Sequence, residues 1–313
     1  MCSVSRISGG RNGQPKFLME SADQQQTCEV YLYGATVTSW RQNGVEKLFC
    51  SPTTPFDGVA AIRGGIPLVF PQFGRPSETM PQHGFARTSN WEVARIDSNA
   101  DSCTVELTLK DNEQTLALWP HPFALQYTLT LNASGLRTTF RAANTGSSPF
   151  QCQALLHTYI AVPHIQNVSV SGFEGLAFHD KMDPPAGDYP LETRTFATID
   201  REVDRIYLDP ATTTDCEGDE FALKTVRVVD QRPDESSEVL LSVDRKAYVK
   251  SEHEVKSLAT DCVLWNAWVD KCKAIGDLED DAYLRYVCVE PGVCSRFETV
   301  APNETLVLDQ FLS

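Results

Sequence analysis

Apolar and polar residues alternate without a break in CTVELTLK (residues 103–110) and again in FALQYTLTL (residues 123–131). A period of two over eight or nine residues is typical of β-strands with one packed face and one solvated face. One short stretch, 251–260, is a candidate helix, with Ser251 as its cap and Glu254 three residues later. Many strands, few helices and frequent Gly and Pro turns predict an all-β fold, a large antiparallel β-sandwich. The other candidate strands are residues 29–33, 35–40, 136–143, 151–161, 223–229, 238–243, 285–290 and 305–311.

The composition narrows the class of protein. The 313 residues carry a net charge of −15, from 42 acidic and 27 basic side chains. An acidic chain repels nucleic acid and anionic membranes, so neither is an expected partner. The first residues lack the apolar run of a signal peptide, and the ten cysteines include no Cys-x-x-Cys pair. These features favour a cytoplasmic protein with reduced, mostly buried thiols, without a disulfide framework or a zinc site.

The chain shows no internal repeat and no long linker. Residues 1–15, rich in Ser, Gly and Arg, are expected to form a loosely held N-terminus. Residues 16–313 are expected to form a single domain, a size that all-β folds often reach undivided. Three acidic and polar stretches, at 216–220, 230–238 and 277–281, are predicted to be solvated loops.

Two neighbouring stretches, AIRGGIPLVFPQFG (residues 61–74) and PQHGFAR (residues 81–87), combine glycines, prolines and two arginines. Gly adopts backbone conformations that other residues resist, and Pro fixes φ, so a stiff and shaped loop is predicted. Guanidinium groups present a planar fork of donors that suits phosphate or carboxylate. A lone arginine is usually a surface salt bridge, but Arg63 and Arg87 are embedded in an apolar, shaped loop. The pattern therefore predicts the wall of a pocket for a small polar anion.

Two further side chains are candidates for chemistry. Strand alternation places His157 on the same face as Tyr159, opposite a face of small and apolar residues. Glu290 is expected to stand at a strand end, because Pro291 cannot donate to the ladder. A carboxylate on an apolar strand is costly unless it is paired or useful. From the residues alone, a hydrogen-bonded core histidine and a strand-end carboxylate that reaches water remain open alternatives.

The loop at 61–74 and 81–87 resembles the hexose-6-phosphate mutarotase family (glucose-6-phosphate 1-epimerases), a branch of the aldose 1-epimerases. The segments LLHTY (155–159), EVDRIY (202–207), WNAW (265–268) and VEPG (289–292) resemble further motifs of this family. They occur in the family's order over roughly residues 28–311. The resemblance implies a galactose mutarotase-like β-supersandwich whose site lies in a concave sheet face. It also implies an isomerase that interconverts the anomers of hexose 6-phosphates, glucose 6-phosphate foremost, without metal or cofactor.

The resemblance assigns roles to particular residues. It implies that Glu290 is the general base and His157 the general acid of ring opening, with the roles reversed on reclosure. It places Arg63 and Arg87 around the phosphate. The further substrate-binding candidates are Gln82, Asp204 as an acceptor for sugar hydroxyls, and His83 and Phe73, which fit a pocket-shaping role better than a catalytic one. Lys271 or Lys273 is a weaker candidate for the phosphate, and Trp265 and Trp268 suit core packing as well as ligand contact.

Three alternatives stay open at this point. An epimerase for unphosphorylated aldoses such as galactose would give Arg63 and Arg87 nothing to neutralise. A non-catalytic carbohydrate-binding or sensing sandwich would have no need for both His157 and Glu290. A retaining glycosidase needs two carboxylates about 5 to 5.5 Å apart, a role in which Asp204 and Glu290 can be imagined.

Overall fold

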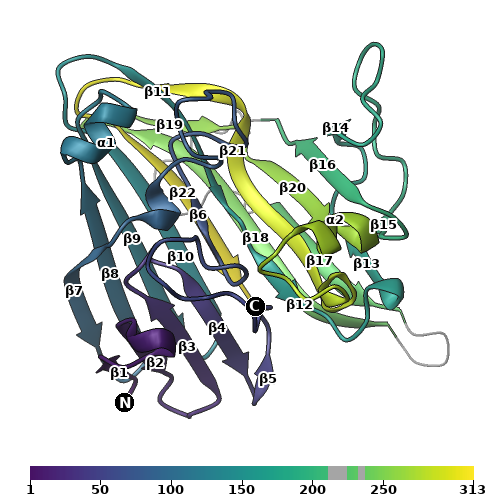
Figure 1. Ribbon diagram of the computed structural model, residues 1–313, viewed down its shortest axis with the longest axis horizontal. Helices are drawn as coiled ribbons and strands as arrows, with labels where there is room; N and C mark the ends of the chain where they lie inside the picture. Colours follow the sequence, from purple (N-terminus) through teal and green to yellow (C-terminus); the bar gives the residue numbers. More distant parts are fainter. Residues whose placement is uncertain (211–223, 232–236) are drawn as a thin grey trace.

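The computed structural model describes residues 1–210, 224–231 and 237–313, whose strands form three antiparallel sheets (Figure 1). The large antiparallel all-β architecture confirms the predicted fold class. The predicted acidic loop at 216–220, and residues 232–236 of the one at 230–238, lie outside the described residues. The five-stranded sheet keeps chain order: β1 (Ser3–Ile7), β2 (Lys16–Glu20), β3 (Gln26–Tyr31), β4 (Val37–Gln42) and β5 (Val45–Glu46).

The start of the chain differs from the loosely held N-terminus expected for residues 1–15. Strand β1 pairs with β2 over its whole length, from Ser3 opposite Glu20 to Ile7 opposite Lys16. The 3-10 helix η1 (Arg11–Gly13) follows, and Arg11 Nη2 donates to the carbonyl of Pro52 at 2.6 Å. Backbone pairing and this long-range hydrogen bond hold a segment whose composition alone suggested a loose end.

The ten-stranded sheet contains the two segments with the clearest alternation. Residues 102–110 and 123–132 pair side by side there as β8 and β9, and every second residue of each is buried. The spatial order is β15 (Phe196–Thr198), β13 (Val168–Ser171), β17 (Lys224–Asp230), β18 (Glu238–Lys250), β22 (Thr305–Leu312), β10 (Gly135–Asn144), β9 (Phe123–Asn132), β8 (Ser102–Lys110) and β7 (Glu92–Ser98), and β19 (Val255–Leu258) pairs with β18.

The seven-stranded sheet is the one that carries the site. Its order is β14 (Ala177–Asp180), β16 (Val203–Leu208), β20 (Asp261–Asn266), β21 (Tyr286–Val300), β11 (Phe150–Leu156) and β6 (Leu68–Val69), and β12 (Tyr159–Ala161) pairs with β21. Besides η1, the described helices are also short: α1 (Glu113–Leu118), α2 (Trp268–Ala274) and the 3-10 turns η2 (Ala86–Thr88), η3 (Ile165–Asn167) and η4 (Ala282–Arg285). None of the helices in the described part of the chain has the length and apolar character needed to cross a membrane.

The two faces of the seven-stranded sheet pack differently. Ala154, Leu156 and Val289 belong to the main core, to which strands of all three sheets contribute. On the opposite face, Tyr159 and Cys288 belong to a second, smaller apolar cluster. The alternation predicted for residues 151–161 and 285–290 is thus confirmed. The second cluster forms the floor on which the candidate site is built.

Residues 251–260 form a turn and a strand, so the helix predicted there is wrong. Glu254 N donates to Ser251 Oγ at 3.0 Å, as the cap pattern indicates, but Ser251 N donates back to Glu254 O at 2.8 Å. Strand β19 then pairs with β18, from Val255 opposite Lys250 to Leu258 opposite Ala247. A local cap is compatible with either a turn or a helix, and the neighbouring strand decides between them.

The sequence predicts a strand end at Pro291, and this prediction is wrong. Strand β21 continues to Val300. Gly292 pairs with Leu155 of β11 and Cys288 with Tyr159 of β12. Pro291 therefore lies opposite the break between β11 and β12, where no ladder hydrogen bond needs its missing N–H. On its other side, β21 stays paired with β20, with Cys262 opposite Pro291.

The glycine-rich loop, residues 61–74 and 81–87, fits closely onto neighbouring backbone. A Cβ atom added to Gly65 would lie 1.9 Å from the carbonyl oxygen of Val37, and one added to Gly84 would lie 2.0 Å from that of Phe70. Both glycines have positive φ, 68° and 73° respectively. Only a residue without a side chain satisfies both the close approach and this conformation. These two contacts fix the wall that carries Arg63 and Arg87.

The loop between β14 and β15 is held by a buried carboxylate. Glu192 accepts hydrogen bonds from Arg194 Nε at 2.8 Å, Arg194 Nη2 at 2.7 Å and the Tyr207 hydroxyl at 2.9 Å. Burial opposes ionisation of Glu192, but the hydrogen bonds from Arg194 and Tyr207 prevail and lower its pKa to about 2. Glu192 therefore ties this loop to β16, which bears part of the site.

We expect Glu192→Gln to destabilise the fold at pH 7 by on the order of 1–2 kcal/mol, after allowing for the exposure of Arg194. The folded-state pKa is depressed, so this stabilisation is present above the unfolded value near 4.3 and is lost as the pH falls towards 2. Urea unfolding of the variant and the native protein at pH 7 and pH 3 measures it. The difference in the free energy of unfolding between the variant and the native protein should be smaller at pH 3 than at pH 7. Glu174→Gln, at an exposed position, is the control. A gap that is equal at both pH values would contradict the assignment.

Candidate active site

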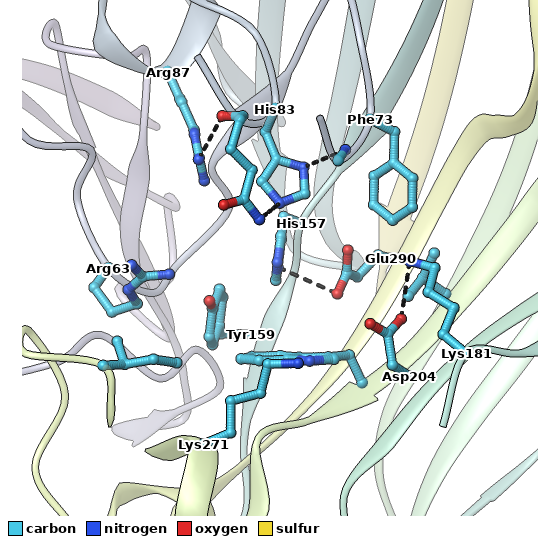
Figure 2. Close-up of a pocket in the computed structure, with 15 residues that line it drawn as sticks. Arg63, Phe73, His83, Arg87, His157, Tyr159, Lys181, Asp204, Lys271 and Glu290 are labelled. Atoms are coloured by element: carbon cyan, nitrogen blue, oxygen red, sulfur yellow. Dashed lines mark hydrogen bonds and ion pairs between the residues drawn. The ribbon is translucent and has the colours of Figure 1, made fainter. Parts of the chain in front are cut away.

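A cavity of about 290 Å³ opens on the face of the seven-stranded sheet that bears the smaller cluster (Figure 2). Its lining draws on the glycine-rich loop, β12, β16, β20, β21 and α2. The structure brings all eight residues predicted for the site into this lining: Arg63, Phe73, Gln82, His83, Arg87, His157, Asp204 and Glu290.

His157 and Glu290 meet in the interior of this cavity. His157 Nδ1 lies 3.3 Å from Glu290 Oε1, and the two residues are 8% and 1% exposed. The His157 backbone N–H donates to Pro67 O at 3.0 Å, and its ring stacks on that of Tyr159 with centroids 4.7 Å apart. Neither His157 Nδ1 nor Glu290 Oε2 has a hydrogen-bond partner among the described residues. The pair is held by backbone and stacking, with polar atoms left available.

The surroundings shift both pKa values towards the neutral forms. Burial, reinforced by Asp204, raises the pKa of the Glu290 carboxyl well above its usual range, against the opposing effect of Lys181. Burial, followed by the neighbouring His83 and then Arg87 and Arg63, lowers the pKa of His157 well below its usual range. A buried acid and a buried base displaced in this way are typical of functional sites.

Two guanidinium groups stand on the other side of the cavity (Figure 2). Arg63 Nε is bound to Asp277 Oδ1 at 3.0 Å, and Arg87 Nη2 donates to Gln82 O at 2.8 Å. Burial, and next the charge of Arg63, lower the pKa of Arg87 to about 10. An anion bound between the two guanidiniums would relieve the effect of the Arg63 charge on Arg87. Asp277 belongs to the stretch predicted to be a solvated loop, but it is only partly exposed and orients Arg63.

Asp204 is paired with a lysine that sequence reasoning missed. Lys181 Nζ lies 3.1 Å from Asp204 Oδ1, and its backbone N–H donates to Asp204 O at 2.9 Å. The same ammonium lies 4.4 Å from the centre of the Phe73 ring. No motif marks Lys181, because it follows the edge strand β14 and reaches the site only through the pairing of β14 with β16.

His83 has a backbone conformation uncommon for a residue with a side chain, with φ of 67°. Its Nδ1 accepts from Gly74 N at 3.2 Å, and its Nε2 lies 3.3 Å from Gln82 Nε2. Burial, and then Arg87, lower its pKa well below the usual range. These contacts tie the two parts of the glycine-rich loop together, in keeping with a pocket-shaping role.

The weaker candidates separate clearly. Lys271 lines the cavity and its Nζ is 2.7 Å from Glu202 Oε1, whereas Lys273 is exposed and outside the lining. Trp265 lines the cavity with its ring T-shaped to that of His157. Trp268, three residues after Trp265 in the same motif, instead packs on Tyr283.

Solved structures with a similar fold are mutarotase-like. The chain superimposes on the crystal structure of a protein from Salmonella typhimurium, provisionally described as a mutarotase, with a TM-score of 0.77 and 26% identity, covering 99% of this chain and 93% of that one. A galactose mutarotase-like protein from Clostridium acetobutylicum gives a TM-score of 0.70 at 15% identity, covering 99% and 98%. The fold is therefore that of the galactose mutarotase-like proteins.

The sequence matches the aldose 1-epimerase family over residues 17–310. A protein from Cenchrus ciliaris, provisionally named glucose-6-phosphate 1-epimerase, is 32% identical over 285 residues, which cover 88% of this chain and 78% of that protein. A protein of the same provisional name from Escherichia coli K12 is 30% identical over 281 residues, covering 89% and 84%. This chain belongs to the aldose 1-epimerase family.

Proposed function

We propose that this protein interconverts the α and β anomers of hexose 6-phosphates, with glucose 6-phosphate the foremost substrate. The observation that carries the proposal is one cavity in which His157 and Glu290 lie 3.3 Å apart while Arg63 and Arg87 line the other side. The names of the relatives from Cenchrus ciliaris and Escherichia coli support the same substrate.

The chemistry requires a base and an acid that are close neighbours. The anomeric hydroxyl and the ring oxygen of a pyranose are bonded to the same carbon, so the groups that serve them must lie side by side. Glu290 removes the proton of the anomeric hydroxyl, whose electrons form the aldehyde C=O as the bond from the anomeric carbon to the ring oxygen breaks. His157 gives its proton to that ring oxygen. Each positioned group is typically worth about 10² to 10⁴ in rate.

Reclosure uses the same two side chains with their roles reversed. The open-chain aldehyde rotates about the bond next to its carbonyl carbon. His157 then takes back the proton of the attacking hydroxyl, and the new anomeric oxygen takes its proton from Glu290. The cycle returns both residues to their starting states, so it needs no co-reactant.

The anion site also tunes the acid. In the sugar-free cavity Arg87 and Arg63 are among the causes that lower the pKa of His157. A phosphate held between these guanidiniums offsets their charge, and so favours the protonated imidazole that ring opening needs. The reactive ion pair of Glu290 and His157 differs from the neutral pair only by one proton moved across 3.3 Å.

Exchange of nuclear magnetisation between the two anomers of glucose 6-phosphate tests the proposal directly. The exchange rate should rise in proportion to the amount of protein added. A neutral hexose such as galactose, run in parallel, should show a much smaller increase. Folded protein that binds glucose 6-phosphate without accelerating the exchange would refute the enzymatic function and leave a binding module.

We expect Arg63→Ala to lower kcat/KM for glucose 6-phosphate by about 100-fold, since a hydrogen bond to a charged group contributes about 1.5–3 kcal/mol. Turnover of free glucose should change less than threefold, because a neutral sugar gives the guanidinium nothing to neutralise. Magnetisation exchange with both sugars measures the two effects.

The matched control for this variant is Arg75→Ala, because Arg75 lies in the same loop but is exposed and outside the cavity lining. It should leave both rates unchanged. Equal losses on phosphorylated and free sugar in Arg63→Ala would remove Arg63 from the phosphate site and favour an epimerase of neutral aldoses.

A further inference from the structure

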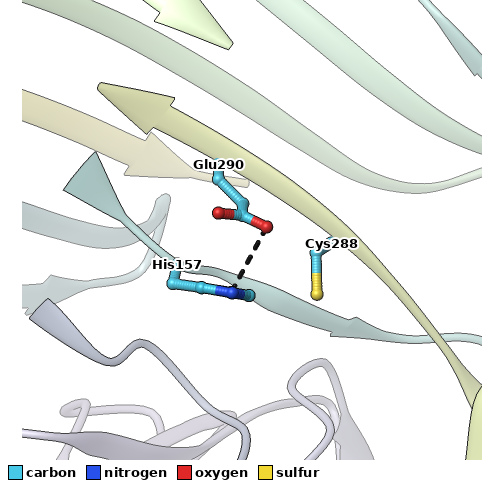
Figure 3. Close-up of side chains that lie close together, drawn as sticks. All are labelled: His157, Cys288 and Glu290. Carbon is cyan, nitrogen blue, oxygen red and sulfur yellow. Dashed lines mark ion pairs between the residues drawn. The ribbon is translucent and has the colours of Figure 1, made fainter. Parts of the chain in front are cut away.

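We propose that His157, Glu290 and Cys288 form a binding site for a thiophilic divalent cation such as Zn²⁺, and that its occupancy stops anomer exchange. Cys288 precedes Glu290 by two residues and shares its face of β21. One potential ligand atom from each of the three buried side chains lies within 4.8 Å of the other two. Figure 3 shows the thiol and the carboxylate on the same strand, both on the side of the strand where the imidazole lies.

The spacing fits a tetrahedral centre. Zinc binds imidazole nitrogen and carboxylate oxygen at about 2.0–2.2 Å, which places two such ligands about 3.4 Å apart at a tetrahedral angle. His157 Nδ1 and Glu290 Oε1 are already 3.3 Å apart. The sulfur of Cys288, at no more than 4.8 Å, has to approach by roughly 1 Å to reach a Zn–S distance of about 2.3 Å.

Unsatisfied polar atoms point to the same site. Within the described part of the chain, the buried Glu290 Oε2 has no hydrogen-bond partner, and the buried His157 Nδ1 has only its 3.3 Å contact with Glu290 Oε1, which lacks hydrogen-bond geometry. A buried polar atom without a partner costs about 1–3 kcal/mol, so native structures rarely retain one without a function. A cation bound between these atoms would satisfy the nitrogen directly and neutralise the carboxylate.

The donor set selects the metal. Imidazole, carboxylate and thiolate together suit zinc, whereas magnesium and calcium prefer oxygen ligands. Three protein ligands leave the fourth position open towards the cavity, where water can enter. Arg63, Arg87 and Lys181 line the same cavity and oppose the entry of a cation. We therefore expect reversible binding that is weaker than at a structural zinc site.

Inhibition follows from the atoms that the metal occupies. A nitrogen or oxygen that ligates a cation cannot give or take the proton of ring opening. This consequence rests on the proposed function, whereas metal binding itself does not. A titration followed both by calorimetry without sugar and by anomer exchange with glucose 6-phosphate therefore tests the two separately.

The experiment uses metal-depleted full-length protein in a buffer that does not chelate zinc, with Cys288→Ala as the variant. The matched control is Cys294→Ala, which is buried on the same strand but outside the three-residue cluster. We expect one Zn²⁺ per chain to suppress exchange in the native protein and the control, with recovery on adding EDTA and no effect of Mg²⁺. Cys288→Ala should keep its basal rate within about threefold and require at least 10-fold more Zn²⁺ for calorimetric saturation.

Equal Zn²⁺ binding by the native protein and Cys288→Ala would overturn the site, and acceleration by Zn²⁺ would overturn its inhibitory role. Stoichiometric binding in a protein that does not exchange anomers would support the site and count against the proposed function alone. A Co²⁺ titration of the native protein guards against a misfolded variant. Bound Co²⁺ should show a thiolate charge-transfer band, and binding without that band would also overturn the proposal.

Discussion

The Glu290→Gln variant is expected to exchange the anomers of glucose 6-phosphate about 10² to 10⁴ times more slowly than the native protein. The amide has the shape of the carboxyl group but cannot accept the proton of the anomeric hydroxyl. Affinity for an analogue that lacks this hydroxyl should change less than threefold, because the phosphate contacts are untouched. Magnetisation exchange gives the rate, and calorimetry gives the affinity.

The stability of the same variant provides an independent check. Burial raises the pKa of Glu290 well above its usual range, so the folded state prefers the protonated carboxyl. The native protein should therefore lose stability as the pH rises from about 4.3 through the folded-state pKa, and the amide variant should not. Glu290→Gln should match the native protein at pH 4 and exceed it at pH 8 in urea unfolding.

The control for this pair of measurements is Glu298→Gln, on the same strand but outside the cavity lining. It should leave the exchange rate unaltered. Near-normal exchange by Glu290→Gln would exclude Glu290 as the base and turn attention to Asp204, the other carboxylate whose charge is felt at this position.

The second large effect is expected from His157→Asn, which should lower kcat for anomer exchange by about 10² to 10³. The native pH profile should be bell-shaped, with limbs that belong to the coupled pair of His157 and Glu290. In the variant one ionisation remains, and activity should rise with pH as the carboxyl ionises and then stay level. Rates measured across the pH range distinguish this outcome from a merely damaged pocket, which would keep both limbs.

His83→Asn supplies the comparison for the second experiment. His83 Nδ1 accepts from the backbone of Gly74, so its replacement should loosen the loop and raise KM more than it lowers kcat. We expect a loss in kcat of less than 10-fold. A loss as large as that of His157→Asn, with the falling limb removed, would identify His83 as the acid.

The local pattern of apolar and polar residues was sufficient to predict much of the strand architecture. Alternation in residues 103–110 and 123–131 reports burial on one side, a property that each strand carries in its own side chains. The same reasoning separated Leu156 from Tyr159 across the sheet. The turn at Ser251 and the continuation past Pro291 depend on which strand lies alongside, and pairing partners distant in the chain are not encoded in a short window.

The site residues also fall into two groups, those that local sequence reveals and those that depend on contacts with distant parts of the chain. Arg63 and Arg87 stand in a composition so unusual that their place in a pocket wall could be predicted, and His157 and Glu290, proposed from motifs, line the same cavity. Lys181 and Asp277 escaped because ordinary polar loops surround them, and only tertiary contacts place them against Asp204 and Arg63. The function of a charged residue in a loop depends on its tertiary partners, and the local sequence does not identify them.

The close approach of Gly65 and Gly84 to neighbouring carbonyls has a consequence for engineering. Neither glycine has room for even a methyl side chain, so laboratory evolution towards other sugars should find few viable substitutions at these two positions. On the opposite side of the cavity, Lys181, Asp204 and Lys271 have side chains that can be replaced. A library for directed evolution should therefore vary these three positions.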